Sequence, residues 1–287
     1  MRVVFRFVVG IMMSLFILGL TNAQNVEGFT QHKGRFWKHK PVKCGDVLED
    51  GNFELRKSLS CDVSPAIAIV GPVQLDLKGH TVSGTDGAGV CIHVSGNGAT
   101  VLNGTVENCE DGIYITAEGE QNTIKGVTSS NNSRRGFNIF GSENLLSNCL
   151  ATDNGRQGFI INGGTGNKIF SCKIARNGRD GIEIRGGAAN NRVSFNRVED
   201  NGSGPSPWSY AGIDVQSGSV NNKIKYNNAC GNLGCDGSGD FPCTARERDF
   251  WDENVDDEGN SVSTNVWRNN RVVCKNVEPE FSPEPED

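Results

Sequence analysis

The chain has 287 residues, 37 of them Gly and 10 of them Cys, and it carries a formal net charge of −6. Apart from one run at its start, no apolar stretch is long enough to cross a membrane, and no group of Cys and His has the spacing of a zinc site. The composition therefore excludes a multispanning membrane protein and a zinc-stabilised domain, and it favours disulfides formed in an oxidising compartment.

The first 23 residues have the pattern of a secretory signal peptide. Arg2 and Arg6 lie beside an apolar run over 7–20, and Ala23 supplies the small residue of a cleavage site. The run is short for a bilayer span, and an uncleaved anchor is the alternative. We expect a secreted, extracellular protein with no membrane association once 1–23 is removed.

The rest of the chain divides by composition into four parts. We predict a polar lead-in over 24–43, a β-helix with its N-terminal cap over 44–232, a C-terminal cap over 233–276 and a disordered acidic tail over 277–287. Charge is unevenly spread, since 13 Lys and Arg stand against 7 Asp and Glu between Asn122 and Asn228. The predicted helix is therefore basic although the whole chain is acidic.

A short pattern returns five times between Gly112 and Asn232. Each unit begins with Gly and two apolar residues separated by one position, and it continues with two Asn that lie ten residues apart. The glycines are Gly112, Gly136, Gly158, Gly181 and Gly212; the first asparagines are Asn122, Asn144, Asn167, Asn191 and Asn222; the second are Asn132, Asn154, Asn177, Asn201 and Asn232.

A period of about 22 to 24 residues with strand-like alternation inside it is typical of a solenoid built from short strands. Each coil can bury its apolar row only against the next coil, and an Asn at a turn can bond the Asn of the neighbouring coil. We therefore predict an all-β fold, a right-handed parallel β-helix solenoid.

The cysteines favour a disulfide-stapled cap at each end of the solenoid. Open solenoid ends expose unpaired strand edges, so caps are expected there. Cys44 and Cys61 bracket a compact segment before the repeat, and we predict a bridge between them. The predicted C-terminal cap draws on four cysteines that allow three pairings: Cys230, Cys235, Cys243 and Cys274.

Two further cysteines lie inside the repeat. Cys149 and Cys172 each follow a ladder Asn by five residues, which places them in one column on consecutive coils. Coils are spaced by about 4.8 Å, within the range of Cα separations that a disulfide accepts. They form either a bridge or two stacked thiols.

The chain resembles secreted right-handed β-helix repeat proteins of the pectate-lyase-like superfamily, including proteins with NosD-type repeats. The resemblance rests on the spacing of Cys44 and Cys61, on the Leu-Asp-Leu-Lys-Gly-His-Thr-Val-Ser-Gly stretch at 75–84, and on the repeated Gly-Ile-x-Ile unit with its two Asn. It implies the fold over nearly all of the mature chain. It implies no single activity, because the superfamily contains lyases, hydrolases, epimerases and adhesins.

Catalytic motifs of that superfamily are missing from the sequence. We find neither the paired Asp-Asp with Gly-His-Gly and Arg-Ile-Lys of its polygalacturonase-like hydrolases nor the Asp-Pro-His-Asp stretch of the alginate-epimerase type. Catalysis is therefore compatible with the sequence but not indicated by it.

Outward-facing columns can be read from the strands, because alternate strand residues face opposite ways. One column is predicted to run Cys91, Tyr114, Asn138, Ile160, Glu183, Asp214, and the next His93, Thr116, Phe140, Asn162, Arg185, Gln216. Stacked carboxylates need a raised pKa or a nearby cation, either Ca²⁺ or an arginine. Glu183, Asp214 and Arg185 are thus the catalytic candidates, and a surface salt bridge is the alternative.

A column of arginines precedes these strands on three consecutive coils. Arg134, Arg156 and Arg179 share one position, and Tyr210 takes it on the next coil. Stacked like charges cost up to about 1 kcal/mol unless they are neutralised, either by Asp153 and Asp180 or by an anionic polymer. A seven-residue insertion that contains Trp208 adjoins them.

We predict that the arginine column, together with Trp208 and Tyr210, binds substrate. A second basic row runs through Lys168, Arg192 and Lys223 on three successive coils, and it can lie on another face. Ordinary solvated side chains are the alternative for both rows.

Three functional hypotheses follow. The first is a monomeric, secreted protein that binds an anionic extracellular or cell-wall polysaccharide along the arginine column and needs no cofactor; such a ligand suits a secreted β-helix better than a nucleic acid. The second is a lyase or C5-epimerase of uronic-acid polymers, in which Arg185 and a calcium ion held by Glu183 and Asp214 neutralise the developing charge. In a variant of it, Glu183 and Asp214 hydrolyse a glycosidic bond. The third is a structural solenoid without a ligand.

Overall fold

The structure, a computed structural model, describes residues 31–32, 40–85, 88–203, 210–234, 246–247, 249–254 and 263–273. The predicted signal peptide, most of the lead-in, Trp208 and the acidic tail lie outside these residues. Within them, no helix is long and apolar enough to cross a membrane.

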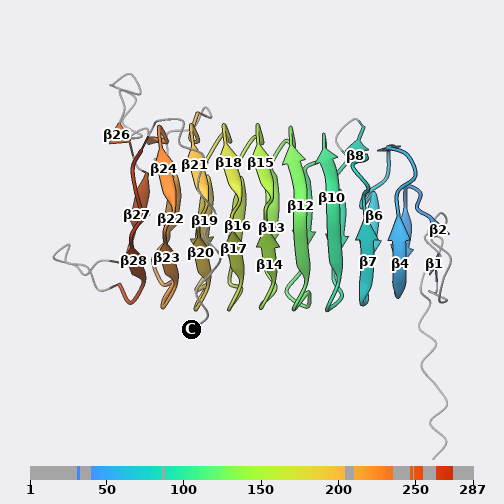
Figure 1. Ribbon diagram of the computed structural model, residues 1–287, viewed down its shortest axis with the longest axis horizontal. Helices are drawn as coiled ribbons and strands as arrows, with labels where there is room; N and C mark the ends of the chain where they lie inside the picture. Colours follow the sequence, from blue (N-terminus) through green and yellow to red (C-terminus); the bar gives the residue numbers. More distant parts are fainter. Residues whose placement is uncertain are drawn as a thin grey trace, which may run out of the picture.

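The described chain winds into a parallel β-solenoid whose coils stack along its long axis (Figure 1). One face is a 10-stranded sheet of parallel strands, each from a different coil. In spatial order the strands are β1 (Gln31–His32), β3 (Asp46–Leu48), β6 (Ile67–Ile69), β9 (Val90–Val94), β11 (Asp111–Ile115), β13 (Arg135–Ile139), β16 (Phe159–Asn162), β19 (Ile182–Arg185), β22 (Ile213–Val215) and β27 (Phe250–Asp252).

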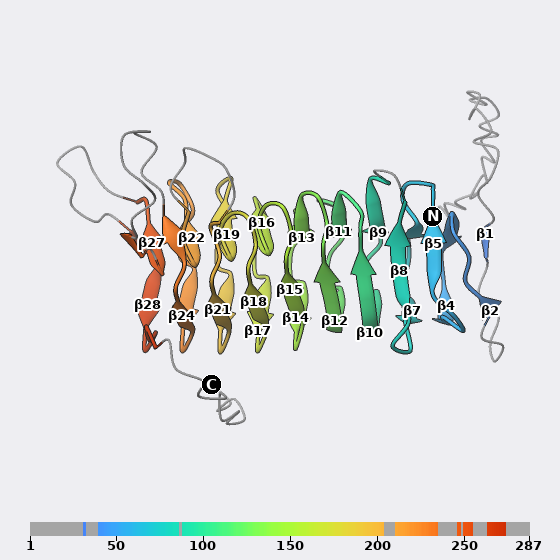
Figure 2. The same cartoon turned by 90° about the horizontal axis from the view of Figure 1, so that it is seen from above.

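The remaining faces are formed by a second, 16-stranded sheet that bends around the core (Figure 2). Its main path is β2 (Lys40–Pro41), β4 (Gly51–Glu54), β7 (Val73–Asp76), β10 (Thr100–Glu107), β12 (Thr123–Ser130), β14 (Leu145–Ser147), β17 (Lys168–Phe170), β20 (Arg192–Ser194), β23 (Lys223–Lys225) and β28 (Val266–Arg268). A side path holds β5 (Leu59–Cys61), β8 (Thr81–Gly84), β15 (Leu150–Thr152), β18 (Lys173–Ala175), β21 (Arg197–Glu199) and β24 (Asn228–Cys230), and β25 (Leu233–Gly234) pairs antiparallel with β26 (Arg246–Glu247).

The pairing continues beyond the boundary at residue 232 that the sequence suggests. β22 pairs with β27 and β23 pairs with β28, so one further coil follows the last regular repeat. The repeat pattern fades there because Asp249 and Asp252 take the positions of the Gly and of the second apolar residue, although Phe250 keeps the first apolar position.

The core is a stack of apolar rows, as the two-residue alternation predicts. Phe137 and Phe159 are fully buried and stack with ring centroids 4.3 Å apart, and isoleucines continue the row on both sides. Gly is required beside this row where a ladder Asn turns inward. At Gly158 an added Cβ would lie 2.6 Å from the Ile174 side chain and 2.8 Å from the Asn177 amide.

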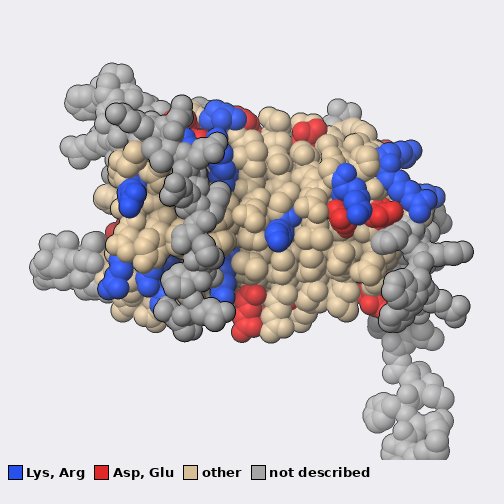
Figure 3. Space-filling model, in the orientation of Figure 1, with Lys and Arg blue, Asp and Glu red and all other residues tan. Residues whose placement is uncertain are grey.

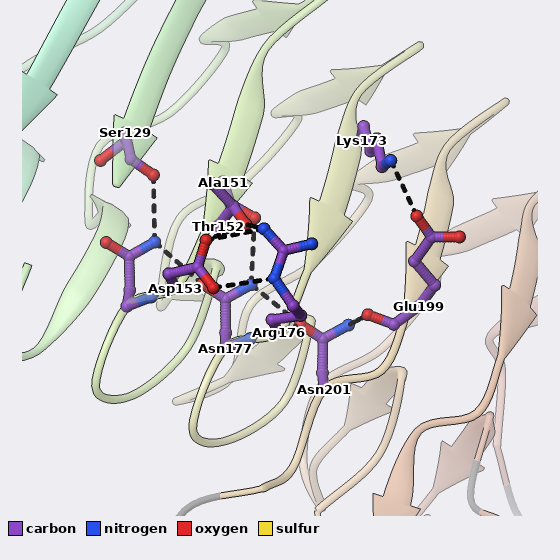
Figure 4. A network of polar contacts seen from close by, with 10 residues as sticks. Ser129, Ala151, Thr152, Asp153, Lys173, Arg176, Asn177, Glu199 and Asn201 are labelled. Carbon is purple, nitrogen blue, oxygen red and sulfur yellow. Dashed lines mark hydrogen bonds and ion pairs between the residues drawn. The ribbon is translucent and has the colours of Figure 1, made fainter. Parts of the chain in front are cut away.

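Both predicted asparagine ladders are present. In each, a buried Asn side-chain oxygen accepts hydrogen bonds from the backbone and the side-chain amide of the Asn on the preceding coil. Asn177, for example, accepts from Asn154 N at 3.2 Å and Asn154 Nδ2 at 2.9 Å, and its own Nδ2 donates to Asn201 at 2.8 Å (Figure 4). Asn265 extends the first ladder, and Asp249 ends the second.

A third ladder was not predicted. It runs through Asn196, Asn227 and Asn270, and Cys149 and Cys172 occupy the same column on the two preceding coils. The two cysteines are buried stacked thiols rather than a disulfide. The spacing of five residues from Asn191 to Asn196 and from Asn222 to Asn227 was the available signal.

Disulfides staple the early coils. The predicted bridge between Cys44 and Cys61 is present, and a second one joins Cys91 to Cys109. Cys230 is also disulfide-bonded, and the other cysteines of the predicted C-terminal cap lie outside the described residues.

The bridge between Cys91 and Cys109 corrects the predicted register of the first regular coil. Strand pairing places His93, not Cys91, beside Tyr114, so Cys91 stands in the glycine column. Cys109 stands at the start of the second Asn ladder, where its N–H donates to Asn132 at 3.0 Å. A disulfide thus replaces the Gly–Asn contact on this coil. The predicted register was wrong because it placed Gly89 in the glycine column, whereas Gly89 lies two residues before Cys91, the residue that occupies it.

We expect Asn177→Ala to lower the free energy of unfolding by about 2–4 kcal/mol, because it leaves the Asn154 amide and the Ala151 carbonyl buried without their partner. Urea unfolding followed by circular dichroism measures the effect. The matched control is Asn97→Ala, an exposed Asn that accepts one bond from the Glu120 N–H, with an expected loss below about 1 kcal/mol. Equal losses at both positions would contradict the structural role of the ladder.

Candidate functional site

The outward side of the 10-stranded sheet carries a row of buried side chains that ends in a pocket at Glu183 and Asp214, and we call the row and the pocket together the trough. Side chains that point away from the core on β13, β16 and β19 are nevertheless buried: Asn138 is 2% exposed, Ile160 0% and Glu183 2%. The residue before each Gly is buried as well, as at Arg135 and Gln157. These residues form the floor of the trough.

Two columns make the walls. Arg134, Arg156 and Arg179 lie on one side, and backbone hydrogen bonds from Arg156 to Arg134 and from Arg179 to Arg156 confirm that they share one column. Arg185 and its neighbour Asn162 lie on the other side. Arginines therefore line both edges of the trough where it passes β19.

Three carboxylates meet at the bottom of the trough. Asp180, Glu183 and Asp214 each offer an oxygen within 4.8 Å of the others, and all three side chains are buried. They line a pocket of about 390 Å³ whose walls include Arg179, Arg185, Gln157, Tyr210 and Trp251. The predicted pairing of Glu183 with Asp214 on adjacent strands is present.

Glu183 receives more side-chain hydrogen bonds than the other two carboxylates of the cluster. Its Oε1 accepts from Gln216 Nε2 at 2.7 Å and from Arg185 Nη1 at 3.4 Å, and its Oε2 accepts from Gln157 Nε2. Burial raises the pKa of Glu183, while the charges of Arg185 and Arg135 lower it. Because donors surround both oxygens, Glu183 is the member of the cluster best able to hold a negative charge. The ion pair with Arg185 is present at 3.4 Å, with Glu183 buried and Arg185 partly exposed.

Asp180 and Asp214 hold their protons more tightly. Burial and the nearby charge of Glu183 raise the pKa of Asp180 to about 7, and its Oδ1 accepts one hydrogen bond from the Ala211 N–H at 2.7 Å. Burial and the charges of Asp180 and Glu253 raise the pKa of Asp214 to about 9. The Oδ1 atom of Asp214 is buried without a hydrogen-bond partner among the described residues.

Tyr210 takes the wall position that follows Arg179. The Arg179 guanidinium lies 5.7 Å from the centroid of its ring, within cation–π range, and the ring is 5% exposed. The Tyr210 hydroxyl has no hydrogen-bond partner in the described part of the chain. Tyr210 thus closes the arginine wall beside the carboxylates.

The predicted neutralisation of the arginine column is only partly correct. Asp153 forms an ion pair with Arg176 at 2.7 Å, as Figure 4 shows, and it does not neutralise the arginine column. Glu110 instead lies 3.4 Å from Arg134. Lys168, Arg192 and Lys223 form a row as predicted, but on the 16-stranded sheet, away from the trough.

Sequence reasoning missed Asp180 as a member of the carboxylate cluster, and it missed Gln157 as a partner of Glu183. Each is the residue directly before the Gly of a repeat, and the sequence pattern assigns this position to the turn. The available signal was their position three residues before an outward-facing residue. A side chain at this position reaches the outward-facing residue of the neighbouring coil, as Asp111 reaches Asn138 and Gln157 reaches Glu183.

The donor set also suits a calcium ion. Calcium prefers carboxylate and amide oxygens, and three carboxylates converge here beside the unpartnered oxygens of Asp214 and Gln157. Such an ion would be held by Asp180, Glu183 and Asp214, and it would supply positive charge where the cluster now relies on protons.

The fold and site together define a right-handed β-helix protein with a polar, carboxylate-bearing trough. The family model for the right-handed β-helix region matches residues 66–240, and the chain belongs to this family. A comparison with curated protein sequences found no match.

Solved structures show the same fold at low identity. An alginate lyase from Paenibacillus sp. str. FPU-7 is similar with a TM-score of 0.51 and 17% identity over 66% of this chain and 70% of that one. The periplasmic alginate epimerase AlgG has a TM-score of 0.50 and 16% identity, over 66% of this chain and 56% of that one, so this chain spans little more than half of the epimerase.

The raised pKa of Asp214 predicts a pH-dependent stability. It is about 9 in the folded chain against an ordinary value of 3.8, so the folded state binds an extra proton between these pH values. The free energy of unfolding should therefore fall, relative to that of Asp214→Asn, as the pH rises from about 4 to about 9. Urea titrations at several pH values across this range measure the difference.

Asp153→Asn is the matched control. The hydrogen bond from Arg176 lowers the pKa of Asp153, so its contribution is present above its unfolded value and constant across the tested range. A difference between native chain and Asp214→Asn that does not vary with pH would show that Asp214 is not held protonated.

Proposed function

We propose that the chain acts on an anionic polysaccharide, which it binds along the trough and from which Asp180 removes a proton while Asp214 donates one. The observation that carries the proposal is the pocket in which three buried carboxylates lie between arginines on opposite walls. Burying carboxylates together is unfavourable for stability, and such groups in a pocket with shifted pKa values are typical of functional sites.

The walls support an anionic substrate. Arg156, Arg179 and Arg185 place guanidinium groups along the edges, where they can pair with sugar carboxylates in two-point contacts. Near neutral pH Asp214 is protonated and Asp180, with a pKa of about 7, is only partly ionised, so the floor repels such a ligand less than ordinary carboxylates would. The fold is shared with an alginate lyase and an alginate epimerase, which agrees with this substrate class.

The three carboxylates can divide the chemistry of a uronate lyase or C5-epimerase. With a pKa of about 7, Asp180 is poised as a general base for the proton next to the sugar carboxyl group. Arg179 and Arg185 then neutralise the charge that develops on that carboxyl group. Glu183 is a positioning residue whose fixed charge raises the pKa of Asp180.

Asp214 completes the reaction as the acid. Its pKa of about 9 keeps it protonated at neutral pH, so it can donate a proton. In elimination, the electrons of the broken C5–H bond form the C4–C5 double bond, the C4–O bond breaks, and the leaving oxygen takes the proton. Epimerisation would instead need a proton donor on the opposite face of C5, because Asp180 and Asp214 lie on the same floor with oxygens within 4.8 Å of each other.

A binding protein without turnover is the second candidate. It is favoured by the arginine column, which reaches past the carboxylates to Arg134 two coils away. In that case the cluster only sets the depth and charge of the trough.

The first test is incubation of the chain with uronate and sulfated polysaccharides, followed by absorbance of unsaturated products, reducing ends and NMR of the polymer. We expect Asp180→Asn and Asp214→Asn each to lower the rate at least about a hundredfold, since each removes a proton-transfer group. Asp153→Asn is the control and should leave the rate unchanged. Salt-sensitive retention with an unaltered polymer would instead establish the binding protein, and neither retention nor turnover would leave a structural solenoid.

The pH profile of the reaction is a second expectation. The rate should rise as Asp180 loses its proton at a pH of about 7 and fall as Asp214 loses its proton at about 9. Glu183→Gln removes the charge that helps raise the pKa of Asp180, so the rising limb should move to lower pH. A limb that stays in place would assign the base to another group.

Adding or removing calcium tests whether protons or a metal ion neutralise the carboxylate cluster. With proton transfer by Asp180 and Asp214, turnover persists in a chelator such as EGTA. An absolute requirement for calcium, together with calcium-dependent thermal stabilisation that Asp180→Asn and Asp214→Asn abolish, would assign the cluster to the ion instead.

A further inference from the structure

A second basic surface lies on the 16-stranded sheet. Lys168, Arg192 and Lys223 occupy one column on β17, β20 and β23, and Lys225 and Arg268 are paired in the adjacent column on β23 and β28. Coils are about 4.8 Å apart, so five cations share a small area. We call these five residues the basic face. Basic side chains gather at the β23 and β28 end of the molecule in Figure 3.

Four of these five cations lack an ion pair within the described part of the chain. No ion pair joins Lys168, Lys223, Lys225 or Arg268 to a carboxylate among the described residues, and no Asp or Glu occupies the two columns from β14 to β28. On neighbouring strands the opposite holds, since Glu199 pairs with Lys173 at 2.9 Å and with Arg197 at 2.7 Å. Stacked like charges are unfavourable, so the basic face favours an external anion.

An aromatic row borders the basic face. Phe170 and Phe195 contact edge to face at 5.5 Å, and Phe195 and Tyr226 stack at 5.0 Å. Tyr226 is 44% exposed although its neighbours shield part of its ring. Phe195 and Tyr226 both adopt left-handed backbone angles, with φ of 57° and 58°, which are uncommon for bulky residues. The exposed ring of Tyr226 thus lies beside the cations although its backbone conformation is unfavourable.

The basic face and the trough lie on different sheets. β17, β20 and β23 belong to the 16-stranded sheet, whereas the trough follows β13, β16, β19 and β22 of the 10-stranded sheet. A single straight polymer chain therefore cannot contact both. Any ligand of the basic face is bound separately from a ligand of the trough.

We propose that the basic face, with Tyr226 at its border, is a separate, non-catalytic binding site for an anionic polysaccharide. Positive charges on successive coils suit a polymer with regularly repeated negative groups, and an exposed aromatic ring suits the apolar face of a sugar. The choice of a polysaccharide over a nucleic acid rests on the proposed function, because a protein that binds separate chains of one polysaccharide matrix at its two faces is held by two contacts and gains avidity. The site keeps the protein on its polymer while the trough releases and rebinds segments.

Salt elution from immobilised alginate, heparin and double-stranded DNA tests the proposal. The basic-face variant Lys168→Ser/Lys223→Ser/Lys225→Ser is compared with a trough-wall variant, Arg134→Ser/Arg156→Ser/Arg179→Ser, which removes the same number of charges. Thermal melts followed by circular dichroism verify that both fold. We expect the basic-face variant to bind alginate about tenfold more weakly and to elute at lower salt, with turnover of a short soluble oligosaccharide unchanged. The trough-wall variant should lose turnover and keep most of its retention.

Tyr226→Ala separates sugar contact from charge alone, and it should weaken retention on alginate but not on DNA. Unchanged retention of the basic-face variant, or equal losses in both triple variants, would overturn the separate site. Tighter retention on DNA than on either polysaccharide would overturn the ligand class. Retention on the polymer is measured independently of turnover. A chain without turnover would therefore contradict the proposed function, whereas the retention of the variants would still test the basic face.

Discussion

The asparagine amide that bonds across two coils is the interaction on which the whole molecule depends. Within the regular coils a ladder Asn accepts two hydrogen bonds from the preceding coil, and its Nδ2 donates to the next one, as at Asn154 and Asn177. These bonds are buried, so slippage of one coil past another would leave amides unsatisfied. The ladders thereby fix which side chains share a column, and the trough is a product of those columns.

The carboxylate cluster shows what this rigid register permits. Asp180 and Glu183 come from one coil and Asp214 from the next, and the ladder bonds from Asn177 to Asn201 and from Asn191 to Asn222 hold the two coils together. Burial at this depth raises the pKa of all three groups. The three carboxylates stay close together despite the unfavourable free energy of burying them, because the ladders prevent the two coils from moving apart.

The sequence was most informative where a residue's role repeats. The Gly and Asn positions predicted the coils, and parallel pairing then placed Glu183 beside Asp214. Burial could not be predicted, because the depth of the trough depends on how the turn column folds over the sheet, and no local pattern encodes that. Asp180 was missed for this reason. The third ladder was obscured because it opens with Cys149 and Cys172, which fill the Asn position with thiols.

Two successive coils of the described chain are longer than the coils before them, yet the ladder hydrogen bonds keep nearly the same length. The bond from Asn144 N to Asn167 spans 23 residues and that from Asn191 N to Asn222 spans 31, and both measure 2.9 Å. In the first of these coils the extra residues directly precede Tyr210 in the sequence, and Tyr210 lies at the rim of the carboxylate pocket. Loop length at this rim is thus free to vary during evolution without a change in the scaffold, so descendants of one solenoid can diverge in specificity while they inherit the same core.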